Sequence, residues 1–194
     1  MALGNTSQYV KAWSAFWAAV LRLRLREYEQ AEALAAQALE RAEQLQLTQL
    51  AAYAPITLGV ARSRLGRVAE GIELTGRGIA GVLEIGAHLQ VGLLTAEQAA
   101  ALGREGATGE ALETVERALR ANPEELVDEP EILRIRGELR LKQDQTELAE
   151  ADFRDALALA QKIGAKSWEL RATMSLARLL ASKGRREEAH DMLA

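Results

Sequence analysis

The 194-residue sequence contains no cysteine, which excludes disulfide bonds and thiolate metal sites. It has only three prolines, so long helices are rarely interrupted, and aromatic residues make up only 4% of the chain. No apolar run is long enough to predict a membrane span. The first twenty residues carry Lys11 within an amphipathic pattern and lack the order of regions of a signal peptide. These absences lead us to expect a cytoplasmic protein without a membrane partner.

The composition that remains is typical of a helical, globular protein. Hydrophobic residues make up 48% and charged residues 27% of the chain, values that disfavour disorder. Alanine, leucine, glutamate and arginine dominate, and all four favour helix over strand. The formal net charge of −4 argues against a nucleic-acid partner, because proteins that bind nucleic acid need a basic surface.

Pairs of small residues recur along the chain with a fixed internal offset of twelve positions. Both members of every pair are glycine or alanine, and successive pairs are displaced by forty positions, except for one displacement of thirty-eight. Self-similarity at a fixed period is the signature of a repeat architecture, here with small residues where two helices approach closely. The five pairs are Ala19 with Ala31, Gly59 with Gly71, Ala99 with Ala111, Gly137 with Ala149, and Ala177 with Ala189.

The spacing predicts an all-α fold of about five helix-turn-helix pairs with a period near 40 residues, arranged as one repeat domain over residues 1–194. We place the units at about residues 8–45, 48–86, 88–122, 129–163 and 165–194. The last unit stops on an apolar stripe, so we expect the chain to be a fragment of a longer protein. Both ends should expose apolar residues and associate with a partner or a second copy. The residues concerned are Trp13, Phe16 and Trp17 at one end and Ala177–Leu180 at the other.

Local signals refine the helix boundaries. Pro55 removes a hydrogen bond inside the first helix of the second unit, which predicts either a bend or a helix that starts at Ala54. Gly66 is expected to form the turn of that unit. Asp144, with Glu147 three residues later, fits an N-terminal capping box for the second helix of the fourth unit.

Residues 76–81 read GRGIAG and match the G-x-G-x-x-G of dinucleotide-binding turns. That function requires a strand before the glycines and a helix that opens on them. Here the preceding residues have helical character and lie inside a repeat, and Gly78 coincides with a small repeat position. We therefore interpret the segment as part of a helix with Gly78 as a packing residue, give no packing reason for Gly76 and Gly81, and predict no bound cofactor.

The fourth unit resembles the tetratricopeptide repeat through Gly137, Ala149, Phe153 and Ala156. The period exceeds the usual repeat length of about 34 residues, so the helices are expected to be longer. The sequence also departs from the family pattern at three positions, so the family's usual peptide-carboxylate clamp does not carry over. The departures are Leu133 and Arg140, where the pattern has Trp and Tyr, and Gln161, where it has Pro.

A closer resemblance covers most of the chain and is most specific from Ser167 to Arg186, which reads SWELRATMSLARLLASKGRR. This stretch resembles the C-terminal tetratricopeptide region of large bacterial adenylate/guanylate cyclase-type signalling ATPases. The resemblance implies a parent protein that places a class III nucleotide cyclase domain first, a P-loop ATPase next and this array last. The motifs of neither catalytic domain occur in the chain.

The sequence contains no constellation that indicates catalysis. It has no G-x-x-x-x-G-K-[ST] phosphate loop. Its two histidines, His88 and His190, lie in different units, and neither has a second histidine at the spacing of a helical zinc site. Acidic residues without a pocket or a partner nucleophile indicate a solvated surface. We therefore predict no catalytic residue, no metal and no enzymatic activity.

In arrays of this family the first helix of each pair lines the concave side. Columns read at the repeat spacing predict a binding face that is aromatic and apolar in the first two units and charged in the last two. A basic column would attract an acidic partner, but each of its residues also lies in the last turn of a helix, where the helix dipole alone favours a cation. The predicted binding residues are Trp13, Phe16, Arg24, Tyr53, Ile56, Arg64, Arg104, Arg134, Lys142 and Arg171.

Two functions follow, and the sequence leaves both open. In the first, the chain is a regulatory module that binds a protein, an acidic peptide or a small effector and controls the neighbouring domains of a signalling protein. In the second, it is a structural scaffold that self-associates, for example as a homodimer, without sensing a ligand. A melting shift with one ligand would favour the first function, and a concentration-dependent dimer without such a shift would favour the second.

Overall fold

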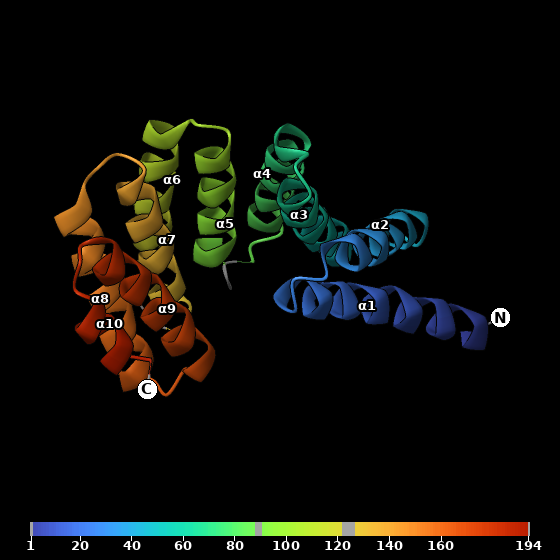
Figure 1. Ribbon diagram of the computed structural model, residues 1–194. Helices are drawn as coiled ribbons and strands as arrows, with labels where there is room; N and C mark the ends of the chain where they lie inside the picture. The colour runs from blue at the N-terminus through green and yellow to red at the C-terminus, as the bar shows by residue number, and fades with distance from the viewer. Residues whose placement is uncertain (1, 88–90, 122–126, 194) are drawn as a thin grey trace. The chain divides into compact units, whose positions relative to one another are not determined.

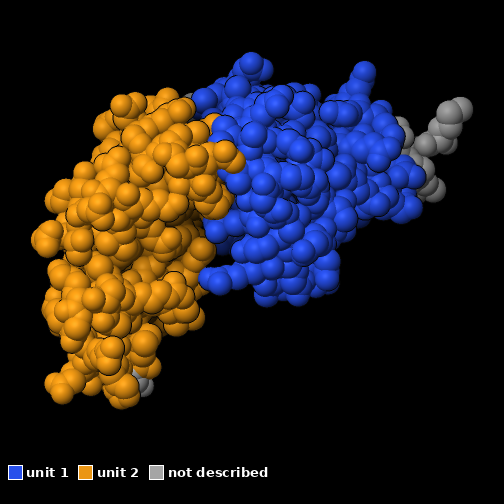
Figure 2. Space-filling view, turned by 45° about the horizontal axis from the view of Figure 1, so that its top comes forward, with its two compact units in different colours: residues 1–89 blue, residues 90–194 orange. Residues whose placement is uncertain are grey.

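The computed structural model describes residues 2–87, 91–121 and 127–193, and this part of the chain contains ten α-helices and no strand. The all-α prediction is confirmed. The chain divides into two compact units, residues 1–89 and 90–194 (Figure 2). His88 and Asn122, where we place the ends of the third repeat, lie outside the described residues. The helices are α1 (Ala2–Arg24), α2 (Tyr28–Gln44), α3 (Thr48–Arg64), α4 (Val68–Glu84), α5 (Val91–Arg104), α6 (Thr108–Ala121), α7 (Glu129–Leu141), α8 (Thr146–Lys162), α9 (Lys166–Ser182) and α10 (Arg186–Asp191).

Unit 1 contains the hairpins α1–α2 and α3–α4, and unit 2 contains α5–α6, α7–α8 and α9–α10 (Figure 1). All five hairpin turns share one geometry, in which a residue with positive φ ends the first helix and the next amide binds the carbonyl five positions earlier. In the α3–α4 turn, Gly66 has a φ of 89° and the Arg67 amide donates to the Arg62 carbonyl at 3.0 Å. The predicted turn at Gly66 is confirmed. The equivalent residues with positive φ are Arg26, Gly106, Asp144 and Gly184.

Asp144 therefore lies in the turn after α7 and does not cap α8. Its φ is 57°, the N-cap of α8 is Gln145, and that N-cap makes no side-chain hydrogen bond. The capping-box prediction is wrong because this turn requires a left-handed residue at position 144, and aspartate tolerates that conformation better than most residues. Glu147, the second member of the predicted box, instead lies 4.0 Å from the ammonium group of Lys183.

The ten small residues of the twelve-residue pairs are all buried, as the repeat predicts. Two glycines of these pairs mark places where neighbouring helices approach closely. A Cβ atom built on Gly59 would lie 2.6 Å from the carbonyl oxygen of Gly71, and one built on Gly137 would lie 2.5 Å from the Phe153 ring. Both hairpins thus pack at a distance that leaves no room for a methyl group.

Pro55 lies inside α3, which begins seven residues earlier at Thr48. The prediction of a helix that starts at Ala54 is therefore wrong. The GRGIAG segment lies wholly within α4. A Cβ atom on its Gly78 would collide with the side chain of Ile56 in α3. The helix-packing interpretation of Gly78 is confirmed by this contact.

The two ends differ from expectation. At the N-terminal end of unit 1, Phe16 is buried and Trp13 is half-buried because both pack in a cluster with residues of α2 and α3, whereas Trp17 is 61% exposed. Of these three residues, which we expected to be exposed, only Trp17 is exposed. At the other end, the apolar positions of the Ala177–Leu180 face are buried with Ala189, so the short α10 covers the face that we expected to be exposed.

Candidate partner-binding surface

Aromatic side chains from two neighbouring first helices meet in unit 1. The Trp13 ring lies 5.8 Å from the Phe16 ring in an edge-to-face arrangement, and the Phe16 ring lies 6.5 Å from the ring of Tyr53 on α3. Tyr9 extends the cluster along α1, with its ring 6.4 Å from that of Trp13. Phe16 is buried, Trp13 and Tyr53 are half-buried, and Tyr9 is exposed. We call Tyr9, Trp13 and Tyr53 the aromatic patch.

Helix spacing builds the aromatic patch. Tyr9, Trp13 and Phe16 follow one another at steps of four and three residues, so they share one side of α1. Tyr53 stands forty positions after Trp13, at the same place in the next repeat. The chain has eight aromatic residues, of which α1 and α3 hold five. Ile56, also predicted for this face, is 1% exposed and therefore belongs to the core.

The predicted basic column stands at helix ends in both units. Arg24, Arg64 and Arg104 are the last residues of α1, α3 and α5, and Lys142 is the C-cap of α7. Lys142 donates a hydrogen bond from Nζ to the carbonyl oxygen of Gly103, in the last turn of α5, at 2.5 Å. This contact satisfies a carbonyl that a helix end leaves without an intrahelical partner. Lys142 thus caps the end of the neighbouring helix α5, whereas the helix-dipole alternative concerns the end of the helix that carries the cation.

Charged residues of α7 and α9 form a network in unit 2. Glu131 is 1% exposed, and its carboxylate accepts hydrogen bonds from Nε and Nη2 of Arg134 at 2.8 and 2.9 Å. Arg171 of α9 approaches the same carboxylate at 3.0 Å. Burial alone would lower the pKa of the Arg134 guanidinium, but its hydrogen bonds with Glu131 and the negative charge of that residue raise the pKa above its usual value. Two arginines thus lie against one buried carboxylate.

The network reaches the surface through Glu138 and Arg171. Glu138 pairs with Arg134 and accepts a hydrogen bond from the Ser175 hydroxyl at 3.1 Å. The Arg171 guanidinium also lies over the Trp168 ring, 5.4 Å from its centroid. The sequence prediction included Arg134 and Arg171 but not the acidic residues that fix them. The spacing of three between Glu131 and Arg134 is the signal that could have shown the first pair.

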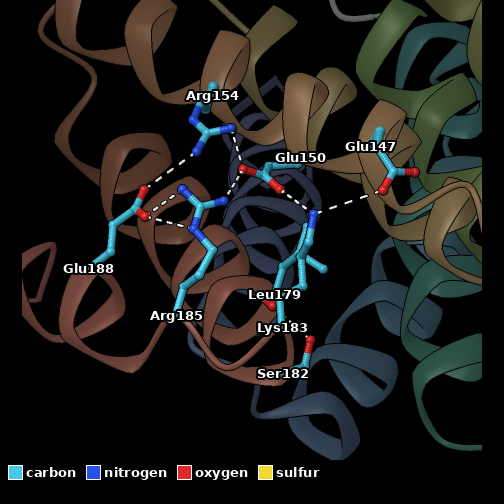
Figure 3. Close-up of polar contacts among 8 residues, drawn as sticks. All are labelled: Glu147, Glu150, Arg154, Leu179, Ser182, Lys183, Arg185 and Glu188. Carbon is cyan, nitrogen blue, oxygen red and sulfur yellow. Dashed lines mark hydrogen bonds and ion pairs between the residues drawn. The ribbon is translucent and has the colours of Figure 1, made fainter.

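A second network, which the sequence analysis missed, surrounds Glu150 of α8 (Figure 3). Its carboxylate accepts hydrogen bonds from Nζ of Lys183 at 2.8 Å and from Nη1 of Arg185 at 2.7 Å, and it also pairs with Arg154. The hydrogen bond from Lys183 contributes most, and these cations together lower the pKa of Glu150 to about 2, although partial burial acts in the opposite direction. The contacts join α8 to the α9–α10 turn.

The same arrangement occurs in unit 1. Glu32 of α2 accepts a hydrogen bond from Nε of Arg62 at 3.1 Å and also pairs with Arg67 in the α3–α4 turn. Its pKa is lowered, chiefly by the hydrogen bond from Arg67. Glu150 lies three repeats after Glu32, and Arg185 lies three repeats after Arg67. The two ion pairs therefore occupy the same positions of the repeat. A comparison of charges between repeats would have found them.

No protein-family model and no curated protein sequence matches the chain, but solved structures match its fold. A Rap protein complexed with competence and sporulation factor aligns with a TM-score of 0.84 at 13% identity, over 94% of this chain and 52% of that one. The Rap conjugation regulator of plasmid pLS20, in complex with the Phr* peptide, aligns with a TM-score of 0.82 at 16% identity, over 99% of this chain and 54% of that one. A thermophilic tetratricopeptide protein of Thermus thermophilus aligns with a TM-score of 0.70 at 23% identity, over 93% of this chain and 87% of that one.

These comparisons show a tetratricopeptide-like fold, as the fourth repeat indicates. The chain spans about half the length of the Rap proteins that it matches. Within the described ranges, no helix is both long and apolar enough to cross a membrane, and no group of three or more acidic or histidine residues is placed to hold a metal ion.

Proposed function

We propose that the chain is a protein-interaction module that binds a polypeptide segment on the first helices of its repeats and has no catalytic role. The aromatic patch carries this proposal. Trp13 and Tyr53 come from successive repeats, and both are half-buried beside the buried Phe16. Aromatic residues with a packed base and an accessible edge are the commonest anchors of protein interfaces. A bound segment would place an apolar or aromatic side chain against this patch.

Charges would set the specificity of binding. Arg24 and Arg64 stand at the ends of the two helices that carry the aromatic patch, so a partner segment with acidic residues next to its apolar anchor would suit unit 1. In unit 2, Glu138 and Arg171 keep 49% and 35% of their side chains exposed while their inner partners hold them in place. Fixed charges of both signs select partners more than they add affinity. That a Rap regulator of this fold was solved with a peptide supports a peptide as the class of partner.

We also propose that the module belongs to a multidomain signalling protein of the nucleotide cyclase and ATPase type and acts in the cytoplasm, where it would sense an effector for its neighbouring domains. The resemblance of the Ser167–Arg186 stretch supports this context. The genomic reading frame that contains the chain tests it. A class III cyclase or P-loop ATPase domain encoded in frame before Met1 would bear the proposal out, and a frame without either would contradict it.

A selection experiment tests the interaction itself. The full chain is used to select binders from a displayed peptide library, and the best peptide is titrated against the wild type and the Tyr53→Ala variant by calorimetry. We expect selected peptides to be enriched in aromatic and acidic residues, and the variant to bind about tenfold or more weakly. Leu148→Ala, which truncates a half-exposed residue on the second helix α8, is the matched control and should bind as the wild type does. Equal affinity for all three proteins would contradict the proposed face.

A further inference from the structure

The outward face of α1 carries apolar residues that none of the helices described in unit 1 covers. Val10, Trp17 and Leu21 are 53%, 61% and 57% exposed, and Ser14 between them is exposed as well. Steps of four, three and four residues place the four side chains in one line on the helix. We call these four residues the α1 stripe. It differs from the aromatic patch, which lies along a neighbouring side of the same helix.

The same four positions are buried in three other first helices. A displacement of one repeat leads from the α1 stripe to α3, and displacements of three and four repeats lead to α7 and α9. None of the twelve equivalent residues is more than 7% exposed. They are Leu50, Ala54, Thr57 and Ala61 in α3, Asp128, Ile132, Ile135 and Leu139 at α7, and Trp168, Ala172, Ser175 and Leu179 in α9.

The second helix of the preceding repeat packs against each of these buried faces. α2 packs on α3, α6 on α7 and α8 on α9. The side chains that it contributes are mostly small. Ala38 and Ala42 of α2 cluster with Leu50, and Ala156 of α8 clusters with Ala172. The α1 stripe is therefore the position at which an alanine-lined helix would pack, since repeats of one design bury the same positions with the same kind of helix.

Ion pairs accompany this packing. Arg62 of α3 binds Glu32 of α2 at 3.1 Å, and Arg140 of α7 lies 3.6 Å from Glu116 of α6. In both cases an arginine near the end of the first helix reaches a glutamate on the preceding second helix. Arg22 of α1 stands at the same repeat position, one repeat before Arg62 and three repeats before Arg140.

The margins of the α1 stripe are basic. Arg22 pairs with Glu27 of its own turn, and both side chains stay partly exposed, at 42% and 38%. The only charged residues of α1 are Lys11, Arg22 and Arg24, all cationic. A partner helix with acidic margins would therefore be attracted, whereas a second α1 would bring like charges together.

We propose that the α1 stripe docks an amphipathic helix of a partner chain that is lined by alanine and edged by glutamate, in the way that α2 docks on α3. Trp17 is larger than Thr57, Ile135 and Ser175, its counterparts in the other repeats, so the partner places its smallest residues opposite this ring. The docked helix packs beside α1 and leaves the aromatic patch open. The docking therefore stands or falls separately from the proposed peptide-binding function.

The test uses the full chain and a defined probe, a fluorescently labelled peptide with the sequence of residues 28–47, which contains α2. Binding is followed by anisotropy for the wild type and for Trp17→Glu and Leu21→Glu, which change exposed residues and should leave the helix content unchanged by circular dichroism. We expect the wild type to bind and both variants to bind at least about tenfold more weakly. Leu148→Glu, which adds the same charge at another exposed leucine, should bind as the wild type does.

A second probe peptide with Glu32→Lys should bind more weakly than the first, and the difference should shrink as salt is added. The proposal is overturned if the wild type does not bind the peptide at concentrations up to about 1 mM, or if the two α1 variants bind it as tightly as the control does. It is also overturned if the chain forms a dimer and Trp17→Glu dissociates this dimer without changing the affinity for the peptide, because the α1 stripe then binds a second copy of the chain.

Discussion

Glu32 and Glu150 occupy the same position in two different repeats, and each pairs with an arginine in the turn of the following hairpin. The two arginines, Arg67 and Arg185, also share one repeat position. Each carboxylate thus joins a second helix to the next helical hairpin, and both have a lowered pKa because the charged form is held by hydrogen bonds. Packing of small residues is therefore supplemented by a recurring ion pair between adjacent hairpins.

The Glu150 network predicts how unit 2 depends on pH. A carboxylate whose pKa falls to about 2 on folding stabilises the folded state above its unfolded value of 4.5, and this contribution is lost as the pH falls from there to about 2. Because Lys183 and Arg185 are partly exposed, we expect Glu150→Gln to lower the free energy of unfolding by about 1–3 kcal/mol at neutral pH. At pH 2 most of this difference should be gone, because the Glu150 carboxylate is then about half protonated in the folded state.

The measurement is thermal or urea unfolding of both proteins at several pH values between about 2 and 7. Glu147→Gln is the matched control, since its carboxylate is 86% exposed and lies 4.0 Å from the same lysine. This control should change the stability by much less. An effect of Glu150→Gln that persists unchanged at pH 2 would show that the charge of Glu150 is not what stabilises the turn.

The glycine of the α7–α8 hairpin predicts a clear effect of one methyl group. Gly137→Ala would place a Cβ atom 2.5 Å from the Phe153 ring, so the buried ring or the helices must move, at a cost of about 1–3 kcal/mol in urea denaturation. Gly109→Ala on α6 meets no atom within 4 Å and should instead raise stability by up to about 1 kcal/mol. Equal effects of the two substitutions would contradict the close approach of α7 and α8.

The α1–α2 turn predicts a stabilising substitution. Arg26 has a φ of 64° at the position that is glycine in three of the five hairpin turns. Arg26→Gly should raise the melting temperature, with a net gain of about 0.5–1 kcal/mol, because the strain of a Cβ atom in the left-handed region exceeds the entropy that glycine adds to the unfolded chain. Arg26→Ala keeps the Cβ atom and should give no such gain. Identical melting temperatures for the two variants would refute this explanation.

The sequence predicts the helical repeat well because small residues at a fixed offset leave few packing alternatives. All ten are buried, and Gly66 forms its turn as expected. The error at Asp144 has a physical cause, since the same residue type suits an N-cap and a left-handed helix end, and only the length of α7 decides between them. The contact of Arg171 with Glu131 could not be predicted, because it depends on how far a side chain reaches between two hairpins.

Substitution of the two arginines of the basic column in unit 1 distinguishes a role in peptide binding from a role in helix capping. The double substitution Arg24→Gln and Arg64→Gln should strongly weaken the binding of a selected acidic peptide, because two cations no longer attract its carboxylates. The affinity should also depend less on the salt concentration. The loss of stability should be small, about 0.3–1 kcal/mol for each helix end. If the melting temperature falls while peptide affinity and its salt dependence stay unchanged, both arginines serve only as helix caps.

Hydrogen exchange of the full chain with and without a selected peptide tests whether the first helices bind the partner, because it maps the bound face without any substitution. We expect the peptide to slow amide exchange in α1 and α3 around Trp13 and Tyr53, with little change in the second helices α2 and α4. Protection confined to the second helices, or no protection in unit 1 at a saturating peptide concentration, would contradict the claim that the first helices bind the partner.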